Sequence, residues 1–136
     1  MTPIQLTTRV VNVSIGLCLG LGLLVGACGG GGDQKKKSNA DPAVVAEAKQ
    51  VWDTRCATCH GPQGMGNGVN AATLKTKPRT FKDADWQKKT TDERIKQVIV
   101  EGGAAVGLSA DMAPNSDLKD KPAVVDELVA MVRSFS

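Results

Sequence analysis

Apolar residues recur at the spacing of an α-helix in three stretches of the chain beyond residue 40. The first stretch follows Asp41 and Pro42, a pair typical of a helix start because it supplies an N-cap side chain and a proline at the first helical position. Its apolar positions are Val44, Ala48, Val51 and Trp52. The spacing predicts a helix with one buried face.

The second and third stretches carry their own start and stop residues. Thr90 with Glu93 three positions later has the pattern of a capping box, and Gly102-Gly103 predicts the end of the second helix. The third helix is expected after Asp120 and Pro122. The apolar stripes of the two helices are Ile95, Val98 and Ile99 in one, and Val125, Leu128, Val129 and Val132 in the other. Because no stretch alternates long enough for a strand, the sequence predicts an all-α fold.

Two long segments rich in glycine and proline, 61–89 and 103–119, separate the predicted helices. Loops of this length are uncommon in a compact domain unless they are functional. We therefore expect them to wrap a bound group.

The N-terminal part has the composition of an export signal. Arg9 is the only charged residue before Asp33, and the stretch from Val10 to Ala27 has no charge. A positive start, an apolar centre and small residues at the end are typical of a secretory signal peptide. As a membrane-spanning helix this stretch is marginal, because it is short and contains several glycines.

The residues Val25-Gly26-Ala27-Cys28 resemble the lipobox of bacterial lipoproteins. The resemblance implies that residues 1–27 are removed, that Cys28 is lipidated, and that 28–40 forms a flexible glycine- and lysine-rich linker. It also implies an exported protein on the periplasmic side of a bacterial membrane, inner or outer. Cleavage by an ordinary signal peptidase and retention as a membrane helix remain the alternatives.

The amino-acid composition argues against several classes of function. The sequence has 136 residues, one histidine, four cysteines, two tryptophans, two phenylalanines and no tyrosine. A net charge of +3 without a clustered basic face argues against a nucleic-acid partner. The single histidine excludes a His-rich metal centre. The folded part, 41–136, is small and poor in large side chains, and domains of that kind usually need a staple, a metal or a cofactor.

The segment Cys56-Ala57-Thr58-Cys59-His60 has the spacing of a c-type haem attachment site. The two thiols lie on one side of a helical turn, and the imidazole follows immediately. A thioredoxin-like redox pair would require a βαβ context, which is absent from the pattern. A zinc site would require two further ligands. A disulfide between the two cysteines would leave the histidine unexplained.

The longer segment from Cys56 to Gly68 resembles the CxxCHGxxGxGxG opening of class I mono-haem cytochromes c. The order of parts over 41–136 is similar to that family throughout. The resemblance implies a small cytochrome c fold of three to five helices wrapped around one haem c. This haem would be bound covalently through Cys56 and Cys59, with His60 as an iron ligand.

The resemblance also implies a sixth iron ligand, for which Met112 in Met112-Ala113-Pro114 has the family's M-x-P context. A thioether ligand favours ferrous iron and suits an electron-transfer haem. Met65 belongs to the turn beside His60, and Met131 lies next to the core stripe of the last helix.

Three further residues are candidates from the same resemblance. Pro78 lies where the family places a proline whose carbonyl accepts the Nδ1–H of the ligating histidine. Arg79 and Trp86 are hydrogen-bond donors that could bind the haem propionates. The family commonly has a glycine where this chain has Ala48, so the contact between the first and last helices is altered, although their crossing is expected to persist.

These residues favour a membrane-tethered electron carrier, not an enzyme. We expect it to move single electrons between redox protein partners, a donor and an acceptor, as a monomer or as a haem subunit of a larger respiratory complex. The alternative within the same fold is a haem enzyme or a gas or peroxide sensor with an open sixth iron position. That alternative needs a distal acid or base, and no second histidine is present.

Overall fold

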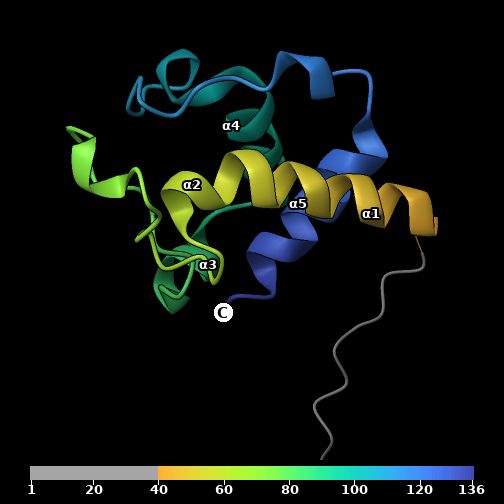
Figure 1. Ribbon diagram of the computed structural model, residues 1–136, viewed down its shortest axis with the longest axis horizontal. Helices are drawn as coiled ribbons and strands as arrows, with labels where there is room; N and C mark the ends of the chain where they lie inside the picture. Colours follow the sequence, from red (N-terminus) through yellow and green to blue (C-terminus); the bar gives the residue numbers. More distant parts are fainter. Residues whose placement is uncertain (1–39) are drawn as a thin grey trace, which may run out of the picture. The chain divides into compact units, whose positions relative to one another are not determined.

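The computed structural model describes residues 40–136, which are helical without any strand (Figure 1). The predicted all-α class is therefore confirmed. The helical elements in chain order are α1 (Pro42–Val51), η1 (Trp52–Cys56), α2 (Ala57–His60), η2 (Ala71–Thr73), α3 (Ala84–Lys89), α4 (Asp92–Ala105), η3 (Ser116–Leu118) and α5 (Pro122–Arg133). The predicted signal segment, Cys28 and the predicted linker up to Asn39 lie outside the described residues.

The elements α1, η1 and α2 follow one another as a single helical rod, residues 42–60, coloured orange to yellow-green in Figure 1. Its predicted start is confirmed, because the Asp41 carboxylate accepts a hydrogen bond of 2.8 Å from the backbone N–H of Ala43. Within the rod, the N–H of Ala57 donates to the carbonyl of Trp52, five residues earlier, which is the π-helical pattern. This wider turn leads directly into the Cys56–His60 motif.

The last helix packs against the first, as predicted. In Figure 1, α5 crosses the α1 part of the rod. Ala48 is completely buried in the core (0% exposed), where a small side chain allows close packing between helices. The predicted stripe of α5 is buried as well. The core residues are Ala48, Val51, Trp52, Phe81, Ile95, Ile99, Leu118, Val124, Val125, Leu128, Val129 and Val132.

The start of α4 differs by one residue from the prediction. The N-cap is Thr91, whose hydroxyl accepts a 3.2 Å hydrogen bond from the N–H of Arg94. Thr90 instead caps the end of α3, since its N–H donates to the carbonyl of Trp86. Glu93 is then the second helical residue, so the predicted capping box does not form. The predicted stop is confirmed at Gly102, which leaves the helical conformation with a φ of 78°.

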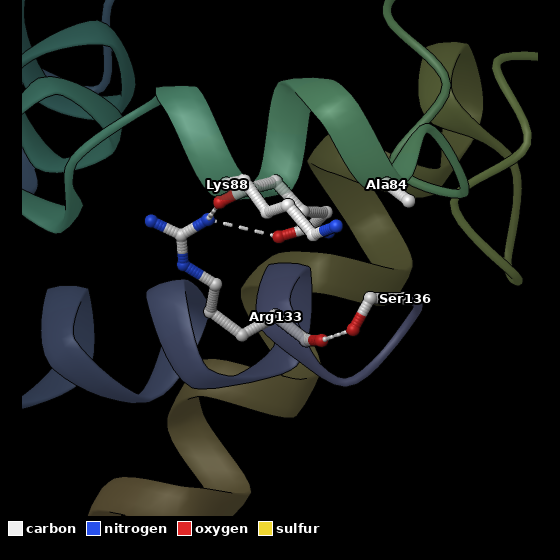
Figure 2. Close-up of a pocket in the computed structure, with 5 residues that line it drawn as sticks. Ala84, Lys88, Arg133 and Ser136 are labelled. Atoms are coloured by element: carbon white, nitrogen blue, oxygen red, sulfur yellow. Dashed lines mark hydrogen bonds between the residues drawn. The ribbon is translucent and has the colours of Figure 1, made fainter.

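The short helix α3 lies inside a segment that was predicted to be a loop. Arg133 of α5 holds it in place by donating hydrogen bonds to the carbonyl oxygens of Gln87 and Thr90, both 2.6 Å long. The same guanidinium contacts the side-chain oxygen of Gln87 at 2.9 Å and pairs with Asp92 at 2.7 Å. Figure 2 shows the Arg133 side chain reaching from α5 to α3, beside the shallow depression that Ala84, Lys88 and Ser136 help to line. The backbone oxygens at the end of α3 are thereby satisfied.

Within residues 40–136, every helix is too short or too polar to cross a lipid bilayer.

Candidate functional site

The two cysteines of the motif lie half-buried at the end of the rod, and both thiols are free. Cys56 ends the π-helical turn, and Cys59 lies in α2 one turn later. Burial raises the pKa of the Cys56 thiol to about 11, so this thiol is protonated at neutral pH. Reactive redox cysteines have a lowered pKa instead. The electrostatics therefore do not support a thioredoxin-like pair.

His60 is the last residue of α2, and a hydrogen bond fixes its ring. The Nδ1 atom lies 3.0 Å from the carbonyl oxygen of Arg79. A carbonyl can only accept, so Nδ1 carries the proton and Nε2 keeps its lone pair. Burial lowers the pKa of His60, although the hydrogen bond to Arg79 opposes this shift. A neutral imidazole with a free Nε2 is the form that binds a metal ion.

This hydrogen bond corrects the prediction for Pro78. The carbonyl that accepts from His60 belongs to Arg79, one residue later. The Pro78 carbonyl is turned toward Gly66 instead, where a Cβ atom would lie only 2.6 Å from its oxygen. The two successive carbonyls therefore face different groups. The Arg79 carbonyl bonds to the histidine ring, and the Pro78 carbonyl lies against the glycine loop.

The glycine loop, residues 61–68, is hydrogen-bonded both to α2 and to the segment that contains Arg79. The N–H groups of Gly66 and Gly68 donate to the carbonyls of His60 and Cys59, at 2.7 and 3.0 Å. These bonds satisfy carbonyls that the end of a helix leaves free. Gly64 in turn accepts a 2.7 Å hydrogen bond from the N–H of Phe81. The loop thus fixes the segment that orients the histidine.

Phe81 contributes to the site although the sequence analysis did not single it out. Its ring stacks on the His60 ring with centroids 4.7 Å apart and planes 21° apart. It also packs against Trp52 and Trp86, with centroids at 6.2 and 5.3 Å. The available indication was composition, since Phe81 is one of only two phenylalanines and follows the Pro78-Arg79 pair closely.

The structure places the other two propionate candidates close to this cluster. Trp86 is half-buried and packs on Phe81. The Arg79 guanidinium is about half exposed and lies 3.5 Å from the Asp83 carboxylate. Both remain candidates for propionate binding.

Met112 lies on a separate segment, residues 108–115, which we call the Met112 strap. Its carbonyl accepts a 2.8 Å hydrogen bond from the N–H of Gly103, so the strap is anchored at the end of α4. The neighbouring Asp111 accepts a 3.4 Å hydrogen bond from the N–H of Thr76, which belongs to the loop following the motif. In Figure 1 the strap (blue) and α3 lie on opposite sides of the rod. Ligation by Met112 stays a prediction.

The residues of this site fit a covalently bound haem. They comprise two free thiols one helical turn apart, a neutral imidazole whose Nε2 is free, and a methionine on a strap of its own. Two cysteines followed by a histidine attach haem c, and a His/Met pair is the axial ligand set of electron-transfer haems. In the described part of the chain, His, Cys, Asp and Glu side chains form no cluster that could hold a metal ion alone. A zinc site therefore fits less well.

A family model described as "Cytochrome c" matches residues 45–134, a range that includes the motif, the Met112 strap, all of α5 and all but the first turn of α1. No curated protein matches the sequence.

Proposed function

Because the chain belongs to the cytochrome c family, we propose that it is a class I mono-haem cytochrome, tethered to a membrane outside the cytoplasm, that passes single electrons between two redox proteins. Covalent haem and electron transfer are general properties of the family. The observation that carries the proposal is the bond from His60 Nδ1 to the Arg79 carbonyl. It leaves Nε2 of the single histidine in the sequence available as an iron ligand, which supports the proposal.

Each residue of the site has a distinct task. Cys56 and Cys59 would hold the haem through thioether bonds. The motif residues are only half-buried, so their exposed side is available to contact the haem. The Arg79 carbonyl and the Phe81 ring fix the orientation of the His60 ring, so that Nε2 is presented as the ligand. When bound, the haem iron supplies the one-electron couple between its ferric and ferrous states.

Met112 is our candidate for the sixth ligand, and its thioether would raise the reduction potential. Two observations support the assignment: the Gly103 anchor, which fixes the Met112 backbone, and the proline two residues later, which stiffens the strap. With the sixth position occupied, the iron would exchange electrons and not bind substrates. The sequence supports a carrier further, because no second histidine could serve as a distal acid or base.

Replacing Met112 with alanine tests this assignment. The Met112→Ala protein should retain covalent haem but have a lower reduction potential and bind carbon monoxide in the ferrous state. Met65→Ala is the matched control, because Met65 lies just after the motif in the sequence and its side chain is 52% exposed. A spectroscopic redox titration of both variants gives the answer. An unchanged potential in Met112→Ala would show that another group is the sixth ligand.

The tether is proposed from the lipobox-like segment that ends at Cys28. Wild-type protein produced in a lipoprotein-processing bacterium should incorporate labelled fatty acid and sediment with membranes. Cys28→Ser should incorporate no label, whereas Cys18→Ser, a change within the same apolar stretch, should behave like wild type. Unlabelled wild-type protein that still sediments with membranes would instead indicate a retained helix.

A further inference from the structure

Arg55 connects the haem-attachment motif to the segment that follows Met112. It lies immediately before Cys56, in the π-helical turn. Its Nη1 atom donates to both carboxylate oxygens of Asp117, at 2.9 and 3.0 Å, and lies 3.4 Å from the side-chain oxygen of Asn115. Asn115 is the last residue of the Met112 strap, and Asp117 follows in η3.

The Met112 strap is otherwise attached mainly to α4, with one longer hydrogen bond, 3.4 Å, from the Thr76 N–H to Asp111. Near its middle, the Gly103 N–H holds the Met112 carbonyl at 2.8 Å. At its end, Asn115 donates twice to the carbonyl of Ile99, from the backbone N–H at 3.1 Å and from the side-chain amide at 2.9 Å. These bonds fix the strap to α4, but they do not fix it to the rod that carries His60. Arg55 supplies that connection.

The other ion pairs between distant elements do not involve the Met112 strap or η3. Lys96 pairs with Asp126 between α4 and α5, Lys121 pairs with Glu47 of α1, and Arg133 pairs with Asp92 between α5 and α4. Those pairs join one helix to another or to a helix start. Among the ion pairs of residues 40–136, the Arg55–Asp117 pair is the one that reaches the chain directly after the Met112 strap.

We propose that Arg55 is a positioning residue that keeps the Met112 strap aligned with the attachment motif and so holds the methionine on the iron. This inference rests on the proposed function, because it requires Met112 to be the sixth ligand. The side chains of Arg55 and Asp117 are 46% and 53% exposed, so the pair contributes little to global stability. Its effect is local: without it, the strap opens more readily.

The test measures how easily an external ligand displaces the methionine. Imidazole is titrated into the ferric, haem-loaded protein, and binding is followed by absorbance. Arg55→Ala and Asp117→Ala should each bind imidazole about two- to fivefold more tightly than wild type, the range expected from losing one exposed ion pair. Lys96→Ala is the matched control, because it removes a pair of similar exposure that joins α4 to α5 and has no partner in the strap or in η3, and it should bind imidazole like wild type.

Unfolding of the same proteins separates positioning from general loosening. The midpoints of Arg55→Ala and Lys96→Ala should be similar, while only Arg55→Ala gains imidazole affinity. Equal imidazole affinities in the two variants would overturn the inference. If Arg55→Ala attaches haem poorly, because it borders Cys56, Asp117→Ala decides alone. A wild-type protein without an iron–thioether charge-transfer band would overturn both the Met112 assignment and this inference; a normal band with unchanged affinities overturns only the role of Arg55.

Discussion

At the scale of single residues, the state of the candidate iron ligand depends on one backbone carbonyl. The sequence identified His60 through its motif, because the order of cysteines and histidine follows from haem chemistry. It placed the carbonyl partner one residue too early, at Pro78 instead of Arg79. A proline can be read from a sequence, whereas the direction of each carbonyl in an irregular segment depends on its neighbours. Here that neighbour is Gly66.

The close approach at Gly66 gives a testable difference between two glycines of nearly equal φ. Gly66 and Gly107 have φ values of +74° and +75°. The unfavourable backbone conformation should therefore destabilise an alanine by a similar amount, about 1–2 kcal/mol, at either position. At Gly66 the new methyl group would also lie 2.6 Å from the Pro78 oxygen, while at Gly107 nothing lies within 4 Å. Gly66→Ala should therefore lower the free energy of unfolding by about 1–3 kcal/mol more than Gly107→Ala.

Denaturant unfolding of the two haem-loaded variants measures this difference. Gly66→Ala should also broaden the resonances of His60, because the displaced segment carries the carbonyl that fixes the ring. Equal losses of stability would mean that the glycine loop does not press on the Pro78–Arg79 segment.

At the scale of helices, prediction was accurate where a long apolar stripe coincided with a start or stop residue. The first and last helices begin at Pro42 and Pro122 as expected, and the second ends its regular course at Gly102. The missed helix, α3, has six residues and a mostly polar sequence. Tertiary contacts hold it in place, namely the packing of Trp86 on Phe81 and the hydrogen bonds from Arg133. A local sequence pattern cannot indicate such contacts.

The contact between the first and last helices predicts a strong dependence on side-chain size at Ala48. This residue is 0% exposed in the core. Ala48→Leu should lower the free energy of unfolding by about 1–3 kcal/mol, because a well-packed interior cannot accept three more carbon atoms without strain. Ala46→Leu on the exposed side of the same helix is the control and should change stability little. Similar stabilities for both variants would contradict close packing at this crossing.

At the scale of the whole molecule, the attachment motif borders the core without belonging to it. The twelve core residues are chiefly valine, leucine and isoleucine, whereas the motif residues from Cys56 to His60 are all half-buried. The family match confirms the small all-α cytochrome fold that the sequence predicted. The scarcity of aromatic residues already indicated that a bound group completes the interior. The predictions for residues 1–39 remain predictions, since they rest on resemblance and composition alone.

The most direct test of the account is the optical spectrum of the mature, full-length protein produced in a host that attaches c-type haem, recorded in both oxidation states. We expect one haem per chain that resists acid–acetone extraction, a low-spin spectrum, and an iron–thioether charge-transfer band in the ferric form. A high-spin spectrum that changes on adding small ligands would contradict the assignment as a carrier and favour an open sixth position. Haem that extracts freely would contradict covalent attachment at Cys56 and Cys59.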